Sequence, residues 1–431
     1  SARRGPRGVA ARAEAAKAGG EASDDGLEAL LEELDLDIDL DELLEPPAID
    51  GDLGELLSDA GAADVDAATG IALTYHNDVD AFDAARGAED TSRVAVVNLT
   101  HAARVRVSGA DRGAFLRRET THGGGVGEVA LVSHGEGAGS VCGAALDAGV
   151  VVSQGQSELL LLPPESRADA AGALGARVRP DEDVTVADVS GPTAQFALVG
   201  EGAADALRSL LGDELVDSPD VAAVLAEGAP AGLSCMAGFQ GSPCSLIRAE
   251  PLGPSTPQLL VVTDAGVTAE MFAALVQAGC VPMGSNCWEK LRVRCGRPRR
   301  GFELGVRGFE RTPLEANLWH ACSAGGAAAE EGEGEPSAGV AEVRQRAAAR
   351  SMEYHLWSLE LPVYVPPGDA VEVDGVEQGM VTSVVQTPGE GELWALAYVK
   401  ARAGVSDGGE VRVGTRRAIA HMPEYGSRRL R

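Results

Sequence analysis

The sequence predicts an α+β protein that ends in a small all-β domain. From about Arg93 onward, short apolar runs typical of strands occur in pairs, separated irregularly by single helical patterns. After about Tyr354 the helical patterns stop, and short strands follow one another with Asp-Gly and Pro-Gly turns between them. The irregular alternation disfavours a regular parallel βαβ sheet, and the closing strands favour an antiparallel β-barrel.

Composition limits the possible partners. The chain has 431 residues and 45% hydrophobic residues, enough for two or three domains with a sizeable core. Its formal net charge of −30 disfavours nucleic acid, because binding phosphates requires an excess of Lys and Arg, and it disfavours a membrane surface for the same reason. An apolar run of about 20 residues, as a spanning helix needs, does not occur. We therefore expect neither a nucleic-acid nor a membrane partner.

The cysteines favour a reducing compartment. Their number, seven, is odd, and no C-x-x-C pair occurs. We expect them to be small buried hydrophobes. Cys280, Cys287 and Cys295 could share a helical face, but no His lies among them, so no metal site is predicted.

Residues 1–48 predict no folded domain. Their start, SARRGPRGVAARAEAAKAGG, is rich in Arg and Ala and nearly free of acids, as in an organellar transit peptide or a basic tail. The stretch LEALLEELDLDIDLDELLEPPAID has Leu at helical spacing among acids, and Pro46 and Pro47 would end such a helix. An acidic solvated tether is the expected role. Residues 49–92 are assigned to an N-terminal extension.

Ordered protein is predicted to begin near Arg93. Strands are expected at RVAVVNL, ARVRVSG, EVALVSH, GVVVS, ELLLLPP, VTVADVS and FALVG. Helices are expected at SGADRGAFLRRET, ESRADAAGALGARV, GAADALRSLLG, TAEMFAALVQAG and SNCWEKLRVRCG. Ser108 and Ser285 would cap the first and the last of these, and Gly296 would end the last. In that last helix Trp288 would point inward, while Arg292 could reach a cleft or solvent.

The end of the chain divides into a linker and a barrel. Residues 324–352 are mostly Ala, Gly and Glu and predict a disordered bridge, with some helical tendency over AEVRQRAAAR. Residues 353–431 contain the strand-like runs LWSLEL, AVEVDG, GMVTSVVQ, LWALAYVK and EVRVG. These runs predict the barrel.

Common catalytic motifs are missing from the sequence. HGEGAGS lacks the third glycine and the acidic residue of a dinucleotide site, and THGGGVGE lacks the Gly-Lys-Ser/Thr of a P-loop. Neither G-x-S-x-G nor H-E-x-x-H occurs. Motif chemistry alone therefore predicts no catalytic residue and no metal ligand.

Three segments in a consistent order carry a family resemblance. They are VVNLTHAARVRVSGADRGAFLRRETTHG, GSNCWEKLRVRCGRP followed by TPLEANLWHACS, and VDGVEQGMVTSVV with LWALAYVKARA. Together they make the chain resemble the YgfZ-like branch of the glycine-cleavage T-protein (aminomethyltransferase) superfamily, in its plant or algal organellar form. The resemblance implies a T-protein/YgfZ-like folate-binding α+β module with internal pseudo-repeats over residues 93–323, closed by a C-terminal antiparallel β-barrel.

The resemblance also implies a function. It implies tetrahydrofolate in a central channel and a supporting role in the assembly or repair of 4Fe–4S proteins. The implied partners are folate and the iron–sulfur assembly machinery or its client apo-proteins. The implied compartment is the chloroplast stroma, with the mitochondrial matrix as the alternative.

Five residues are candidates for the folate site: Arg292, Trp288, Glu250, His101 and Glu315. Arg292 suits the glutamyl carboxylates of folate, since a guanidinium forms paired, charge-assisted bonds with them; a structural ion pair with Glu289 or Glu315 explains it equally well. Trp288 would pack beside it. By resemblance, Glu250 lies where relatives place a pterin-binding carboxylate. His101 lies near the expected channel, or is a supporting histidine with its hydrogen bonds satisfied.

The sequence departs from the family at two places. The acidic pair that assists transfer in true aminomethyltransferases would fall at about Cys142 and Gly143, which are not carboxylates, so classical transfer chemistry is not expected. The Lys-Gly-Cys loop of YgfZ relatives is absent, and Cys322 is expected to be a buried apolar substitute rather than a displaced reactive thiol. Three hypotheses remain: an iron–sulfur accessory protein, a folate-dependent aminomethyl or methyl transferase, and a catalytically silent scaffold.

Overall fold

The computed structural model describes residues 51–87, 90–121, 127–134, 142–211, 218–306, 308–322, 336–389 and 391–426. The chain divides into two units, Ser1–Gly51 with Ala67–Gly70, and Asp52–Asp66 with Ile71–Arg431. In the first unit only Gly51 and a turn in Ala67–Gly70 are described. The predictions for residues 1–48 lie outside the described residues, and all that follows concerns the second unit.

Regular structure begins well before Arg93, at α4 (Gly51–Asp59). A short antiparallel hairpin of β1 (Asp64–Val65) and β2 (Ala72–Thr74) follows, and then α5 (Asp78–Arg86). Ala81, Phe82 and Ala85 on α5 are buried in the main core, so this segment is part of that core. The sequence of α5 shows no clear apolar pattern, because its buried face consists mostly of small alanines between aspartates.

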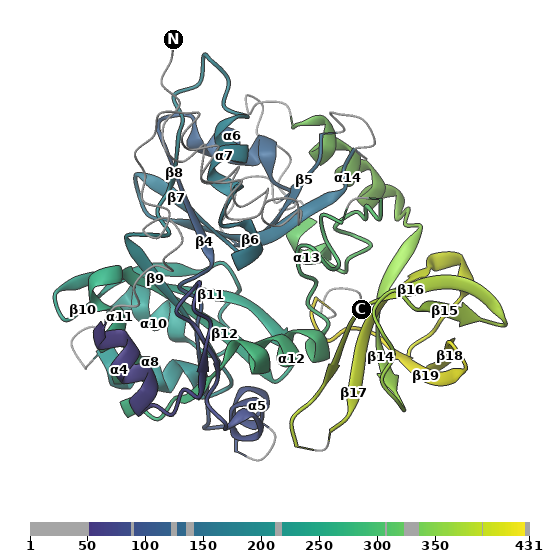
Figure 1. Cartoon of the computed structure of the whole chain (residues 1–431). Coiled ribbons are helices and arrows are strands. Elements are labelled where there is room, and N and C mark those ends of the chain that lie inside the picture. The colour runs from purple at the N-terminus through teal and green to yellow at the C-terminus, as the bar shows by residue number, and fades with distance from the viewer. Residues whose placement is uncertain are drawn as a thin grey trace, which may run out of the picture. The chain divides into compact units, whose positions relative to one another are not determined.

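The first sheet is antiparallel, in the order β5-β6-β7-β4-β8 (Figure 1). Its strands are β4 (Ala103–Ser108), β5 (Gly127–Val132), β6 (Ala145–Ser153), β7 (Ser157–Leu162) and β8 (Thr185–Asp188), and its helices are α6 (Arg112–Glu119), the 3-10 turn η1 (Pro164–Ser166) and α7 (Ala170–Gly175). The predicted strands are confirmed. Ser108 as helix N-cap is wrong: Ser108 ends β4, and α6 starts only after Asp111. Asp111 does not cap α6; its Oδ2 instead accepts the Asp183 N–H at 2.9 Å.

The second sheet has the order β10-β11-β12-β9-β3-β13, with only β3 and β13 parallel. Its elements are β3 (Ala95–Asn98), β9 (Thr193–Val199), α8 (Ala203–Leu211), α10 (Pro219–Leu225), β10 (Ser234–Phe239), β11 (Ser242–Gly253), β12 (Thr256–Asp264), η2 (Ala265–Val267), α11 (Thr268–Gln277) and β13 (Val281–Met283). The order β9-β12-β11-β10 repeats the connectivity of β4-β7-β6-β5. The pseudo-repeat that the resemblance implied is therefore present as two sheets.

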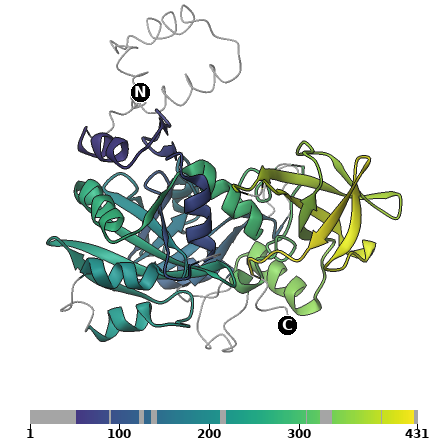
Figure 2. The ribbon, with the colours of Figure 1, turned by 90° about the horizontal axis from the view of Figure 1, so that it is seen from below.

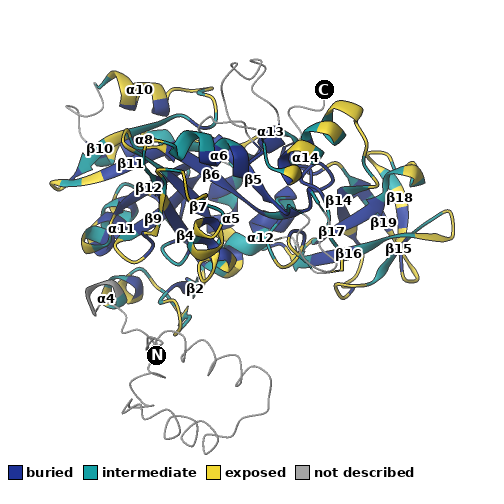
Figure 3. Cartoon of the chain, turned by 90° about the horizontal axis from the view of Figure 1, so that it is seen from above, coloured by how far each residue is buried: buried dark blue, intermediate teal, exposed yellow. Residues whose placement is uncertain are grey.

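The main core lies between the two sheets. On β3, Ala95 and Val97 face this core, while Val96 faces a second core with α8, α10 and α11. Figure 3 shows the buried residues concentrated on the strands and the exposed ones on loops and outer helices.

Helix α12 (Ser285–Cys295) connects this core to the barrel. Gly296, with φ 82°, ends the helix as predicted. Ser285 does not cap it, because Gly284 occupies the N-cap position. The close packing at Gly284 excludes any larger residue, because a Cβ on it would lie 2.3 Å from the Leu73 carbonyl oxygen.

Part of the predicted linker is a packed helix. After α13 (Trp319–Cys322), residues 323–335 lie outside the described residues, and α14 (Ala338–Ala349) follows. Ser337 caps α14 by accepting the Val340 N–H at 3.4 Å. Val340 and Val343 pack against Leu314 and Val132, so residues 336–349 are not the disordered bridge that their composition predicted, although the helical tendency is confirmed.

The remaining strands close into the predicted barrel (Figure 2). Their order around the barrel is β14-β17-β16-β15-β18-β19. They are β14 (Tyr354–Leu361), β15 (Ala370–Val373), β16 (Val376–Gln386), β17 (Leu393–Lys400), β18 (Gly409–Val413) and β19 (Arg416–His421), with a 3-10 turn η3 (Ala401–Ala403). The fold class is thus α+β with a closed antiparallel barrel. Within the described part of the chain, every helix is too short or too polar to cross a membrane.

Candidate functional site

Three polar atoms with unmet hydrogen-bonding capacity lie at the corner between β3 and β4. Asn98 Nδ2, His101 Nδ1 and Gln195 Oε1 are buried and have no hydrogen-bond partner among the described residues. Hydrogen bonds tie this corner together: Leu99 N–H to the Gln195 carbonyl at 2.8 Å, and Thr100 N–H to Asn98 Oδ1 at 2.9 Å. Because buried polar atoms are normally paired, this β3–β4 corner, residues 98–101 with Gln195, is a candidate ligand site. Asn98 pairs with Phe196 on β9, so the side chains of Asn98 and Gln195 leave opposite faces of the sheet.

The corner offers donors and acceptors without charge. Asn98 and Gln195 are each 4% exposed. Burial, and next the positive charge of Arg167, lower the pKa of His101 to about 4, so its imidazole is neutral at pH 7. A neutral imidazole has one donating and one accepting nitrogen. The unpaired Nδ1 favours a ligand-facing His101 over the alternative of a histidine with satisfied hydrogen bonds.

Arg104 holds the backbone of the β3–β4 corner in place. Its fully buried guanidinium donates to the carbonyl oxygens of Thr100, Ser190 and Thr193 at 2.9, 2.6 and 2.9 Å, and to that of Ala102 at 3.1 Å. Burial lowers its pKa to about 10, which still leaves it charged at pH 7. A rigid cation thus holds the turn that presents the unpaired atoms.

Arg292, predicted to contact folate, is instead enclosed by protein. It is 3% exposed and does not reach a cleft or solvent. Its Nε and Nη2 donate to the Glu289 carboxylate at 2.8 and 2.6 Å, and its Nη1 donates to Glu303 at 3.1 Å. Further bonds go to the Arg297 carbonyl at 2.5 Å and to Ser383 Oγ at 3.2 Å.

These contacts engage all five N–H donors of the guanidinium. Burial alone would lower the pKa of Arg292, but Glu303 and Glu289 outweigh burial and raise it. The geometry therefore favours the ion-pair alternative, with Glu289 as predicted and with Glu303 in place of Glu315. Because Ser383 belongs to β16, Arg292 also links α12 to the barrel.

The other predicted site residues each have their own contacts. Glu315 is 4% exposed and accepts the N–H groups of Thr312, Glu353 and Tyr354 at 2.8, 3.0 and 3.2 Å, so it organises the entry into β14. Trp288 packs on the main core from α12. Glu250 lies half-buried on β11. Of the five predicted residues, only His101 lies at the corner with unpaired atoms.

Asp147 is a buried carboxyl that sequence reasoning missed. It lies on β6, is 1% exposed, and accepts a hydrogen bond from the Ser166 hydroxyl and the Ala148 N–H at 2.8 Å. Arg300 donates to Ser166 Oγ at 2.8 Å. Burial raises the pKa of Asp147 to about 7, which would suit a general acid or base near neutral pH.

Five of the seven cysteines are buried as expected, whereas Cys142 and Cys235 are half-buried. Cys322 is 5% exposed, and burial raises the pKa of its thiol to about 12, so it is an unreactive thiol at pH 7. This favours the apolar substitute over the displaced nucleophile. Cys142 and Gly143, where the family's acidic pair would fall, lie in a turn under α14: a Cβ on Gly143 would lie 3.1 Å from Glu342 Cγ.

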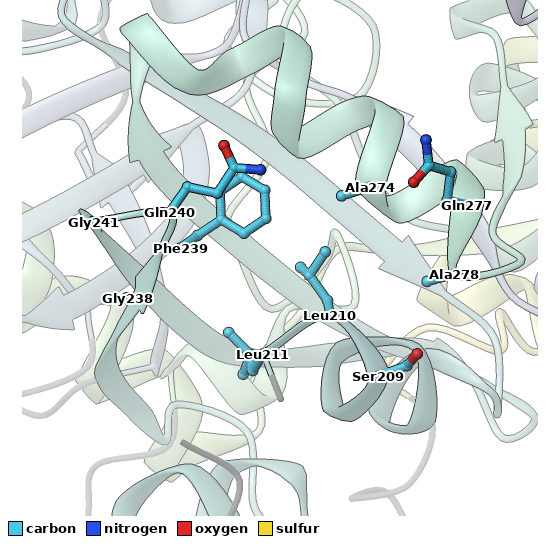
Figure 4. A pocket seen from close by; sticks show the side chains of 10 residues that line it. All are labelled: Ser209, Leu210, Leu211, Gly238, Phe239, Gln240, Gly241, Ala274, Gln277 and Ala278. Carbon is cyan, nitrogen blue, oxygen red and sulfur yellow. The ribbon is translucent and has the colours of Figure 1, made fainter. Parts of the chain in front are cut away.

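A surface hollow of ≈ 650 Å³ lies elsewhere, between α8, α11 and the β10–β11 hairpin (Figure 4). It is lined by Ser209, Leu210, Leu211, Gly238, Phe239, Gln240, Gly241, Ala274, Gln277 and Ala278. None of these side chains titrates near neutral pH, and Figure 4 shows only amide and hydroxyl groups among the apolar ones. The described lining of this hollow therefore offers no acid–base group.

The sequence and structure comparisons with known proteins agree with one another, because each finds a protein named as a transferase. A putative transferase of Arabidopsis thaliana, named chloroplastic, is 27% identical over 379 residues, covering 86% of this chain and 78% of that protein. An aminomethyltransferase of Corynebacterium jeikeium is 28% identical over 380 residues, covering 83% and 88%. The fold matches the crystal structure of the glycine cleavage system aminomethyltransferase T from Bartonella henselae with a TM-score of 0.64 at 16% identity, over 88% of this chain and 98% of that one. No family model matches.

The chain is thus similar in sequence to aminomethyltransferases and shares the aminomethyltransferase fold. The structure has two features that no sequence motif indicated: the buried, unpaired polar atoms of Asn98 and Gln195, and the buried Asp147. The signal for Asp147 was a single carboxylate inside an otherwise apolar strand, ALDAGVVVS. Asn98 and Gln195 gave no signal, because their segments meet only through the pairing of β3 with β9, in which Asn98 lies opposite Phe196.

Proposed function

We propose that this protein binds tetrahydrofolate at the β3–β4 corner and supports the assembly or repair of 4Fe–4S proteins, rather than acting as a classical aminomethyltransferase. In this proposal it belongs to the YgfZ-like branch and works in the chloroplast stroma, with the mitochondrial matrix as alternative. Its partners are folate and the iron–sulfur assembly machinery or client apo-proteins. In this proposal the 4Fe–4S cluster is carried by those partners.

The unpaired atoms of the corner carry the folate part of the proposal. A pterin ring presents both donors and acceptors along its edge; Gln195 Oε1 is an acceptor, and His101 Nδ1 donates or accepts according to its tautomer. Leaving such atoms unpaired costs about 1–3 kcal/mol each, a cost that a bound ring would remove. Glu250 and Trp288 remain proposed contacts from β11 and α12.

The turn under α14 supports a role other than classical transfer. Cys142 and Gly143 supply no carboxylate, and α14 packs directly on Gly143. A transferring methylene needs an anionic or titratable group within reach. The name of the Arabidopsis relative, which places that protein in the chloroplast, supports the organelle.

Calorimetric titration with tetrahydrofolate tests the site. Gln195→Leu and His101→Ala should each weaken binding about tenfold, the loss expected for one hydrogen bond of about 1.4 kcal/mol. Gln277→Ala, in the surface hollow, is the matched control and should bind like wild type. Arg292→Ala should bind like wild type wherever it stays folded. Equal affinity across all variants would remove the corner from the folate site.

The iron–sulfur role has a separate test. The chain should restore 4Fe–4S enzyme activity in a bacterium that lacks its YgfZ protein, and Gln195→Leu should restore less. Folate binding without any restoration would reject the accessory role but keep the folate site. A catalytically silent scaffold predicts that outcome.

One observation favours a second candidate, a folate-dependent aminomethyl or methyl transferase. Asp147 lies on β6 four residues beyond Gly143, and its pKa of about 7 suits proton transfer at neutral pH. Turnover of an aminomethyl donor on a lipoyl carrier with tetrahydrofolate, lost in Asp147→Asn while folate affinity is unchanged, would support it. No turnover by wild type would reject it.

A further inference from the structure

The segment after the last barrel strand, Met422–Gly426, leaves the barrel and is buried against the two-sheet module. We call these residues the strap. Its start is tied to the barrel, where the Met422 N–H donates to Asp407 Oδ1 at 2.9 Å. Three residues later Tyr425 is 1% exposed and belongs to the main core.

The carboxylate of the strap is held by two arginines. Arg86 of α5 donates two hydrogen bonds to Glu424, at 3.2 and 3.1 Å, and Arg294 of α12 donates a third at 2.7 Å. Burial alone would raise the pKa of Glu424, but the hydrogen bond from Arg86 and the charges of both arginines lower it. Such paired, charge-assisted bonds are the strong ones in recognition.

Both the backbone and the side chain of Tyr425 are recognised. Its N–H donates to the Cys295 carbonyl at 2.8 Å, and its carbonyl accepts from Asn317 Nδ2 at 2.5 Å. Its hydroxyl donates to the buried Glu128 of β5, which also binds His320 Nε2. The His320 ring stands edge-on to the Tyr425 ring, with centroids 5.2 Å apart.

Glycines make room for the strap. A Cβ on Gly296 would lie 2.4 Å from Pro423 Cβ, and one on Gly253 would lie 2.5 Å from a Glu424 carboxylate oxygen. Within the strap, a Cβ on Gly426 would lie 2.5 Å from the Asn317 carbonyl oxygen. Side chains at these positions would collide with the path of the chain, so the module is shaped around a Pro-Glu-Tyr-Gly backbone.

We propose that these groups form a peptide-binding groove and that the strap is its resident, releasable ligand. The groove binds a carboxylate, a tyrosine hydroxyl and one peptide unit. Proteins recognise short peptides by such groups. The strap pairs with no strand of either sheet, so it can leave without breaking a sheet. Because the strap is tethered to the barrel, its effective concentration at the groove is in the millimolar range. This concentration keeps even a ligand of moderate affinity bound. Its release opens the groove to the same sequence of a second copy.

A labelled peptide of the strap sequence, HMPEYGS, tests the groove. In the full chain, the double variant Glu424→Ala/Tyr425→Ala withdraws the resident ligand. This variant should bind the peptide at least tenfold more tightly than the wild-type chain, whose groove is occupied. A control peptide with Gln and Phe in place of Glu and Tyr should bind the double variant at least tenfold more weakly.

Two outcomes would overturn the proposal. One is a folded double variant that does not bind the peptide; the other is equal binding by variant and wild type. If the double variant does not fold, hydrogen exchange of Tyr425→Phe in the full chain decides. Its position-425 amide, bonded to Cys295, should exchange at least tenfold faster than in wild type, and Tyr364→Phe on an exposed barrel loop should leave that exchange unchanged. Unaltered exchange in Tyr425→Phe would reject the groove.

Discussion

The two sheets share a connectivity but differ in what they bury. The first repeat, residues 103–188, buries charged side chains in its interior: Arg104, Arg118, Glu119, Glu128 and Asp147. The second, residues 193–283, buries no charged side chain among its described residues, and its buried polar groups are amides and hydroxyls. One topology therefore accommodates either kind of interior, and of the two repeats, as far as the structure describes them, only the first buries charged groups.

The contrast can be followed at one equivalent position. Ala103 pairs with Leu162 at the end of β7, and Thr193 pairs with Asp264 at the end of β12. The next residue along each strand is Arg104 in the first repeat and Ala194 in the second. Both are fully buried, yet one is a hydrogen-bonded cation and the other a methyl group.

The largest effect is expected from removing that cation. Arg104→Met should lower the free energy of unfolding by roughly 3–5 kcal/mol, because several carbonyl oxygens lose their only charged donor inside the protein. Urea unfolding measures this. Arg106→Met, exposed on the same strand, is the control and should change stability by less than about 0.5 kcal/mol. A small effect at Arg104 would mean that the two repeats differ less than their interiors indicate.

The next effect depends on pH. The folded pKa of Asp147 is about 7, above the ~3.9 of an unfolded aspartate. Between these values the folded state holds a proton that the unfolded state has lost, so stability falls as pH rises. The loss is complete above pH 7 and is on the order of 4 kcal/mol.

Asp147→Asn should therefore be more stable than wild type at pH 8 and nearly equal to it near pH 4. Unfolding curves at both pH values measure the difference. An identical pH dependence of the two proteins would show that Asp147 is ionised in the folded state.

In the second repeat, we expect a polar substitution in the core to lower the free energy of unfolding. Cys244 is 1% exposed in an apolar cluster, and burial raises the pKa of its thiol to about 11. Cys244→Ser should cost about 1–3 kcal/mol by burying an unpaired hydroxyl. Cys244→Ala, which only removes the sulfur, should cost less. If Ser is tolerated better than Ala in thermal unfolding, this interior is not the apolar counterpart described here.

The smallest effect is expected at the surface of the second repeat. Asp205 and Arg208 form an exposed ion pair at 2.6 Å on α8. Asp205→Asn should change the free energy of unfolding by a few tenths of a kcal/mol, because water screens such pairs. A change above about 1 kcal/mol in denaturant unfolding would mean that surface charge stabilises this repeat more than its core pattern indicates.

The sequence predicted elements with a clear apolar pattern and missed those without one. The first sheet, the barrel strands up to β18 and α14 were visible as alternating or periodic runs. β11 was missed because Pro243, Pro251 and two charged residues interrupt its twelve-residue run. Caps were predicted at Ser108 and Ser285, but contacts with distant residues, Asp183 and Leu73, shifted both helix starts.

The candidate site was less predictable than the fold. His101 was found because it belongs to a quoted signature. Arg292 was assigned to folate because an isolated sequence shows a guanidinium but not the carboxylates that will enclose it; Glu303 lies eleven residues away and meets it only after the chain turns. Unpaired atoms such as Gln195 Oε1 are a property of packing and have no sequence signal.

Helix α14 has a consequence for the solubility of the molecule. β5 is the outermost strand of the first sheet, and its outer edge is paired at Leu131 and Ala130, by Thr120 and Thr121. Backbone groups left unpaired on such an edge are open to other chains. α13 and α14 lie over its end, where Gly339 approaches so closely that a Cβ would lie 2.2 Å from the Ser133 carbonyl oxygen. A larger residue at 339 would lift this cover, and we expect its first symptom to be self-association through an exposed strand.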